Sequence, residues 1–348
     1  MDNFTLLAFI APIVAIAIIP VSTTIKVILV IIFLALMFYF KRGYFYLVLG
    51  TNIINNGKGD RQRGWEFFKK GWRAGLSDSS ALVVANLFAN HKDPSVALKI
   101  YDSILKKKES KVREEAKTGK ALSLWALDNK EEAVDILRLL FDRGQISKNA
   151  ALYLSSYLIN LGYLDEAYTV VEKSLKIIPK SYKLLDLKAY LLYLRGSVNS
   201  ANELYEQLFN ERIYKFPEIY FHAAEVAISL NEEIKAKNYL NEALNFPFLK
   251  TSALKREEVE GLLNSVTESL DSDGSLVFDF YDDEDLFADE PTSVEEEYLE
   301  IELNTLLDPD DYYYDEEYGD DLDLDDQPSL ESSLFEDEYE DDEQELGF

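Results

Sequence analysis

The chain contains no cysteine and only two histidines, and these two shortages exclude many kinds of catalytic and metal site. Without thiols there are no disulfides, thiolate metal sites or cysteine nucleophiles. His91 and His222 lie far apart in the sequence, so a histidine-based metal site or a Ser-His-Asp triad is disfavoured. We find no other catalytic constellation in the 348 residues. We therefore expect no enzyme activity, no cofactor or metal, and no small-molecule substrate.

Basic residues are absent from the C-terminal part of the chain. Residues 267–348 hold 35 Asp and Glu without a single Lys or Arg, which leaves 29 acids against 35 bases in residues 1–266. Because unbalanced charge repels itself, residues 271–348 are predicted to be a disordered acidic tail. Its short apolar islands suggest binding motifs for a partner protein, and a solubilising brush is the alternative. Such a tail would repel a polyanion, so nucleic-acid binding is disfavoured.

The charge split suggests a further hypothesis for the tail. A basic body and an acidic tail on one chain attract each other, and the covalent link makes their effective concentration high. The tail would then fold back onto the body and compete with an acidic ligand.

The N-terminus is strongly apolar. Between residues 4 and 40 the only charge is Lys26. One helix of this length would extend about 55 Å at 1.5 Å per residue, whereas the core of a bilayer is about 30 Å thick. Pro20 and the Ser/Thr residues after it favour a break. The pattern predicts a membrane anchor of residues 1–43, whose two helices, about 4–20 and 25–40, form a hairpin.

Two alternatives to the hairpin follow from the same stretch. A single bent span would place the N-terminus on the other side of the membrane. A secretory signal peptide fits less well, because residues 1–3 carry no positive charge and the apolar stretch is too long. Basic residues follow the second helix, so the positive-inside rule places the body and the tail in the cytoplasm, at the inner membrane. These residues are Lys41, Arg42, Lys58, Arg61 and Arg63.

A ladder of alanines runs through the middle of the chain. Successive members are 36, 34, 34 and 35 residues apart, and each is followed by a similar pattern of apolar residues. A period near 34 residues is typical of helical-hairpin repeats, in which each unit buries its apolar face against its neighbours. The alanines are Ala97, Ala133, Ala167, Ala201 and Ala236.

With these alanines at position 20 of each unit, the chain resembles the tetratricopeptide-repeat family. The units then begin near Asp78, Glu114, Lys148, Tyr182 and Pro217. Position 8, which the alignment does not force, is small every time: Ala85, Ala121, Ser155, Ala189 and Ala224. Small residues at both positions allow the two helices of a hairpin to approach closely. The resemblance implies an all-α, right-handed α-solenoid with five units over 78–251; an unrelated α-solenoid is the rival fold.

Both flanks of the five units also show helical patterns. We expect residues 44–77 to form a degenerate first repeat, with 44–55 as one of its helices, and residues 252–270 to form a capping helix. Local signals inside the array agree with the repeat register. Asp93-Pro94 is typical of a helix start, and Gly162 and Gly196 are typical of helix ends.

The resemblance also implies a ligand groove lined by the first helix of each unit. Nine residues are candidates to line it: Asn86, Asn149, Tyr153, Asn160, Lys183, Tyr190, Tyr193, Phe221 and His222. Amides can bond the backbone of a peptide or helix, and tyrosines give contact area at little entropic cost. The alternative is that several of them belong to the core or to solvated surface. The carboxylate clamp of chaperone-binding relatives is incomplete, because Leu82 and Gly119 accompany Asn86.

The sequence therefore predicts a membrane-anchored scaffold that binds partner proteins by its groove, its tail or both. The alternative is a structural or assembly factor of an envelope complex that acts through its membrane hairpin. A regulatory subunit of an enzyme is a third, weaker hypothesis.

Overall fold

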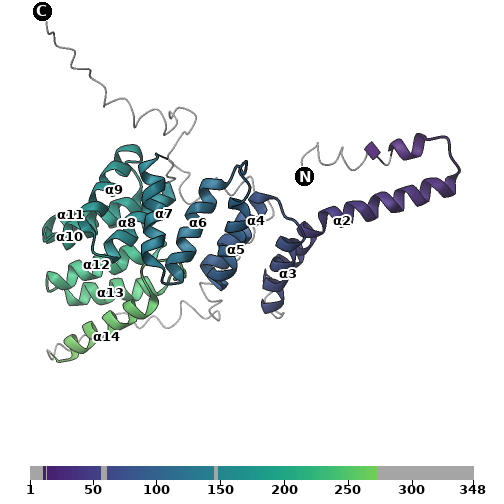
Figure 1. Ribbon diagram of the computed structural model, residues 1–348. Helices are drawn as coiled ribbons and strands as arrows, with labels where there is room; N and C mark the ends of the chain where they lie inside the picture. Colours follow the sequence, from purple (N-terminus) through teal and green to yellow (C-terminus); the bar gives the residue numbers. More distant parts are fainter. Residues whose placement is uncertain (1–10, 13, 56–60, 145–147, 273–348) are drawn as a thin grey trace, which may run out of the picture. The chain divides into compact units, whose positions relative to one another are not determined.

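The computed structural model describes residues 11, 12, 14–55, 61–144 and 148–272, and all the regular structure in these ranges is helical (Figure 1). The chain divides into two compact units, Met1–Ser77 and Asp78–Phe348. The predicted acidic tail lies outside the described residues, apart from its first two positions. The start of the predicted anchor, residues 1–10, lies outside them as well.

In the first unit the chain bends close to the predicted position. Residues 14–18 are helical, residues 19–22 are bent or irregular, and α2 (Thr23–Asn55) follows. The ammonium of Lys26 donates a hydrogen bond of 2.6 Å to the carbonyl oxygen of Ala17, at the end of the preceding helical stretch. A cation there complements the negative end of the helix dipole.

The prediction of separate helices at 25–40 and 44–55 is wrong, because α2 runs through both as one helix of 33 residues. The charges of Lys41 and Arg42 suggest an end to the apolar helix, but charge does not interrupt backbone hydrogen bonding. Gly43 is the only weak helix former at the junction, and one glycine costs only about 1 kcal/mol.

The second half of α2 packs against α3 (Arg61–Arg73) through two pairs of glycines. A Cβ atom added at Gly43 would lie 3.0 Å from the carbonyl oxygen of Gly71, and one at Gly71 would lie 3.0 Å from that of Gly43. Gly50 and Gly64 face each other in the same way, with 3.1 Å in both directions. The two backbones are therefore nearly in contact, and any side chain at these positions would push them apart.

In the second unit, Asp78–Phe348, the described residues up to 272 form consecutive helix pairs followed by one more helix (Figure 1). Its first helices begin at or within one residue of the five predicted unit starts. The pairs are α4 (Asp78–Leu87), which continues into the π-helical turn η1 (Phe88–Lys92), with α5 (Pro94–Leu105); α6 (Arg113–Ala126) with α7 (Lys130–Asp142); α8 (Lys148–Asn160) with α9 (Leu164–Ile177); α10 (Tyr182–Leu194) with α11 (Val198–Glu211); and α12 (Pro217–Ser229) with α13 (Glu233–Leu244).

The small residues of the alanine ladder lie at the centre of this packing. All ten small residues at positions 8 and 20 have 0% exposure, Ser155 included. Such burial is what a close approach of two helices requires, because a larger side chain would separate them. The predicted helix ends are confirmed too. Asp93 accepts a hydrogen bond of 3.0 Å from the amide of Ser95, and Gly162 and Gly196 have φ of +82° and +86°.

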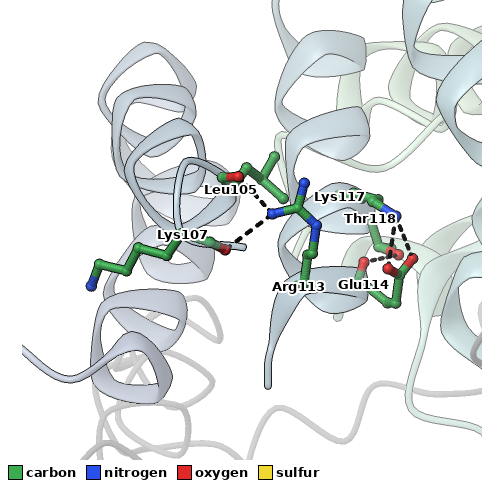
Figure 2. A network of polar contacts seen from close by, with 6 residues as sticks. All are labelled: Leu105, Lys107, Arg113, Glu114, Lys117 and Thr118. Carbon is green, nitrogen blue, oxygen red and sulfur yellow. Dashed lines mark hydrogen bonds and ion pairs between the residues drawn. The ribbon is translucent and has the colours of Figure 1, made fainter. Parts of the chain in front are cut away.

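The first gap in the ladder is longer than the others because of the loop before α6. Figure 2 shows Arg113 reaching from the start of α6 to one carbonyl oxygen at the end of α5 and one in the loop just after it. Its Nη1 donates to the carbonyl of Leu105 at 2.6 Å and to that of Lys107 at 3.1 Å. These bonds satisfy carbonyl oxygens that the helix end leaves unpaired. The longer loop therefore still connects the first helix pair firmly to the second.

Most neighbouring first helices of the pairs lie side by side. Among the described helices that are not neighbours in sequence, the extensive contacts join first helices: α4 with α6, α8 with α10, and α10 with α12. Because first helices approach one another more closely than second helices do, they line the inner side of the curve. We call this surface the first-helix face.

The array ends in α14 (Arg256–Ser272), which packs against α13. A helix thus lies where we expect the capping helix, but it begins at Arg256 and not at residue 252. The amide of Lys255 donates a hydrogen bond of 2.7 Å to Glu258, as in a capping box, and this bond marks the start of the helix.

Candidate functional site

An irregular segment of the chain, with a turn at Lys250 and Thr251, lies on the first-helix face. We call residues 246–255, which connect α13 to α14, the strap. The amide of Lys250 donates to the carbonyl oxygen of Asn90 at 3.0 Å, and its ammonium donates to that of Lys92 at 2.6 Å. The hydroxyl of Thr251 donates to Oδ1 of Asn90 at 2.9 Å, and Thr251 is fully buried. The strap is therefore bonded to the end of the first helix of the first pair.

The strap also contacts the third and the fifth pair. The hydroxyl of Tyr157 in α8 donates a hydrogen bond of 2.7 Å to the carbonyl oxygen of Thr251. The hydroxyl of Ser252 donates one of 2.7 Å to Glu218 in α12. Tyr157 is fully buried and stacks on Trp125 of α6, with ring centroids 3.8 Å apart and planes 3° from parallel. Burial raises the pKa of Tyr157 well above its usual range, so its hydroxyl remains a donor.

These bonds link residues 34 to 161 positions apart. A segment that joins the first, third and fifth pairs fixes the curvature of the array. It also shows that the first-helix face binds a non-helical segment of polypeptide through backbone carbonyls as well as side chains.

A buried ion pair lies further along the same face, between α10 and α12. Nδ1 of His222 lies 3.0 and 3.1 Å from the two carboxylate oxygens of Asp186, and both residues are buried. The hydroxyl of Tyr205, from α11, donates to Asp186 at 3.0 Å. Burial alone would lower the pKa of His222, but the charge and hydrogen bond of Asp186, with more distant Glu225 and Glu218, raise it overall.

Two half-buried tyrosines extend this ion pair toward the surface. The ring of Tyr190 stacks on His222 at 3.8 Å and 14°, and Tyr193 stacks on Tyr190 at 5.9 Å. Burial, then the charge of Glu225, raises the pKa of both tyrosines, so both hydroxyls stay protonated and able to donate. We call Tyr190, Tyr193 and His222, with Asp186 beneath them, the tyrosine–histidine cluster.

The structure thus brings together three of the nine groove candidates. Phe221 adjoins them, with its ring 6.1 Å from that of His222 in an edge-on contact. Lys183, at the start of α10, places its ammonium 5.3 Å from the ring of Phe216.

Four candidates lie outside the cluster. Asn86 accepts a hydrogen bond of 2.6 Å from the hydroxyl of Tyr101 in α5, so it holds a hairpin together. Tyr153 packs beside the buried Tyr157, with ring centroids 5.9 Å apart. Asn160 is exposed at the end of α8. Asn149 is in α8, but its side chain lies outside what the structure describes.

Sequence reasoning missed the residues that hold this face together. Asp186 has a visible signal, since it is a lone acid within the apolar run Leu184-Leu185-Asp186-Leu187. Tyr157 and the strap have no such signal, because their partners are distant in sequence. In the part of the chain that the structure describes, no group of three or more His, Asp and Glu is arranged to hold a metal ion.

In the first unit, α2 is long and apolar enough to cross a membrane. Its apolar window has a mean hydropathy of 2.4 and is not buried by other parts of the protein. A signal sequence near an N-terminus would satisfy the same criterion of length and composition.

The fold defines the class of protein: an all-helical solenoid of tetratricopeptide-like hairpins. A solved tetratricopeptide repeat protein from Parabacteroides merdae has a similar fold, with a TM-score of 0.52 and 18% identity over 65% of this chain and 85% of that chain. A thermophilic TPR protein from Thermus thermophilus gives a TM-score of 0.44 and 20% identity over 55% of this chain and 99% of that chain. No protein-family model and no curated protein sequence matches the chain.

Proposed function

We propose that the chain is a membrane-anchored scaffold that holds partner proteins at the cytoplasmic side of the membrane through its first-helix face. The observation that carries this proposal is the strap. A surface that buries Thr251 completely and bonds the backbone on both sides of it is suited to another non-helical segment of protein. Main-chain hydrogen bonds provide affinity in this mode of recognition, and side-chain pockets provide specificity.

The tyrosine–histidine cluster is the part of the face that a partner would contact. Tyr190, Tyr193 and Phe221 are half-buried, so their rings are held in place while one edge remains accessible. Rigid, partly exposed aromatic side chains lose little entropy when a partner covers them. The partner is therefore a protein segment that offers apolar side chains to the rings and backbone groups to the hydroxyls.

Membrane attachment and sidedness are supported by α2 and its surroundings. The described residues of the first unit contain eight Lys and Arg and a single acid, Glu66. The positive-inside rule associates such an excess beside an apolar helix with the cytoplasm. The second unit and the tail would then be cytoplasmic.

A position-specific crosslinking experiment tests the proposal. A photoreactive phenylalanine analogue replaces Tyr193 or Phe221 in the full chain, and intact membranes are illuminated. Leu139, half exposed on the second helix α7, is the matched control position. We expect protein adducts from the two first-helix positions and not from Leu139. Adducts from Leu139 at equal yield would contradict a specific face.

The same experiment tests the alternative function. Ile31 is 60% exposed in the apolar half of α2. Protein adducts from Ile31 alone would favour an assembly factor that acts through its membrane helices.

A further inference from the structure

The first unit gathers basic side chains at one level of α2, immediately after its apolar half. From residue 25 to residue 40 the large apolar side chains of α2 are mostly exposed, and Lys41 follows at once. From Gly43 onward one side of α2 is buried, at Gly43, Leu47, Gly50, Thr51 and Ile54, because α3 packs against it. The helix therefore changes from an exposed apolar rod to one half of a packed hairpin within one turn.

The contact between Gly43 and Gly71 sets which residues share this level. Since α3 runs antiparallel to α2, residues after Gly71 lie on the same side of the contact as residues before Gly43. A Cβ atom at Gly43 would also lie 3.3 Å from both Gly75 and Leu76, so the chain that leaves α3 stays at this level. At 1.5 Å per residue, Lys41, Arg42, Lys70 and Arg73 fall within about 5 Å of one another along the axis.

We call these four residues the basic collar, and no described acid of the first unit forms an ion pair with any of them. Glu66 is the only acid among the described residues of the first unit, and it pairs with Lys69 at 3.0 Å. Lys41, Lys70 and Arg73 are exposed, and the guanidinium of Arg42 lies 4.2 Å above the ring of Tyr39. Exposed cations beside interfacial aromatic residues, at the end of an apolar helix, suit the headgroup region of a bilayer.

We propose that the basic collar binds the phosphate headgroups of anionic phospholipids in the membrane that α2 crosses. The proposal rests on the membrane attachment inferred above and adds the lipid class that this attachment prefers. Sequence order alone places only Lys41 and Arg42 at the membrane surface. The glycine contact adds Lys70 and Arg73, about thirty residues later in the sequence, and so doubles the local charge.

Lipid selectivity of the full chain tests the collar. The protein is reconstituted into phosphatidylcholine vesicles that contain a trace of spin-labelled phosphatidylglycerol or spin-labelled phosphatidylcholine. The ratio of motionally restricted label for the two lipids measures the preference. One cation near an anionic headgroup is worth about 1 kcal/mol, or about fivefold, at most. We expect a clear preference for phosphatidylglycerol in the wild type, lowered several-fold by Lys70→Gln combined with Arg73→Gln and by high salt.

The matched control is Lys106→Gln combined with Lys108→Gln, which removes two exposed cations from the second unit. It should leave the preference unchanged. Two results would contradict lipid binding by the basic collar but not membrane attachment: vesicle-bound protein with equal affinity for both lipids, or an equal loss of lipid preference in the control variant. If alkaline carbonate removes the protein from the vesicles, α2 does not cross the membrane. That result would contradict both the membrane attachment and the lipid binding by the basic collar. Helix content measured by circular dichroism confirms that each variant is folded.

Discussion

Replacing Tyr157 by Phe removes one hydroxyl from the first-helix face and nothing else. The ring and its stack on Trp125 remain, but the carbonyl oxygen of Thr251 loses its hydrogen bond of 2.7 Å. Thr251 is fully buried, so water cannot easily replace the lost donor. The strap should therefore detach more often, while the helix pairs around it remain folded.

The size of the effect follows from the chemistry of one buried acceptor. Leaving such a group unsatisfied costs about 1–3 kcal/mol. Local opening of the strap would then be about 5- to 150-fold more frequent, since each 1.4 kcal/mol is a factor of ten. The amide of Lys250 reports this opening, because it donates to Asn90 in the closed state. Hydrogen exchange of the strap, measured by mass spectrometry on the full chain, should accelerate by that factor.

Tyr214→Phe is the matched control for this substitution. It also removes a buried hydroxyl that donates to a carbonyl oxygen, that of Leu208 at 3.0 Å, and the hydrogen bonds of Tyr214 go to Leu208 and Tyr220 and not to the strap. We expect it to leave the exchange of the strap unchanged. If Tyr157→Phe leaves that exchange unchanged as well, the strap is not held by the first-helix face and the reasoning is refuted.

Two further predictions concern the glycine contacts and the buried ion pair. Gly50→Ala places a Cβ atom 2.6 Å from the buried ring of Phe68, so it should cost about 1–3 kcal/mol and accelerate hydrogen exchange in α3; Gly261→Ala, which meets nothing within 4 Å, should not destabilise the chain. His222→Leu leaves the carboxylate of Asp186 buried without its cation and should cost about 3–5 kcal/mol in thermal or denaturant unfolding. Because the pKa of His222 is raised in the folded state, this deficit should be largest below about pH 6.5 and shrink as the pH rises through the raised pKa; a deficit that grows with pH would contradict the ion pair.

The second unit could be predicted from sequence because its packing repeats locally. Each hairpin needs a small residue on both helices, so Ala97 and Ala85 recur as a pair at a fixed spacing. Turn chemistry adds independent local signals, such as the positive φ of Gly162. Because these packing requirements act within 34 residues, the same residue types recur in every helix pair. The repeat can therefore be recognised from the sequence alone.

The packing of the first unit follows the same physics with a different residue. Gly43 and Gly50 are seven residues apart, as are Gly64 and Gly71, and these spacings place each pair on one face of its helix. The seven-residue spacing is visible in the sequence. The sequence does not show, however, that the glycines of α2 pack against those of α3. Charge at Lys41 was misleading, since it marks the end of the apolar surface and not the end of the helix.

The candidate site was predicted only in part because its contacts are long-range. The helix period places Tyr190 and Tyr193 on one face, and the next unit supplies His222, so local register suffices for them. Asp186 is recognisable as an acid in an apolar run, but its partner is 36 residues away. The strap joins Thr251 to a residue 161 positions earlier, and no periodic rule encodes such a contact.

The central claim is that the first-helix face holds a non-helical segment of polypeptide, and the absence of cysteine makes this claim directly testable. Lys92→Cys and Lys250→Cys introduce the only two thiols in the full chain, at positions that one hydrogen bond of 2.6 Å joins. A short bismaleimide added to intact membranes should link them rapidly within one chain, and gel mobility should shift accordingly. The control pairs Lys92→Cys with Glu203→Cys on the second helix α11, and it should link much more slowly. Equal rates for the two pairs would contradict the account, because the strap would then not be bound to the face.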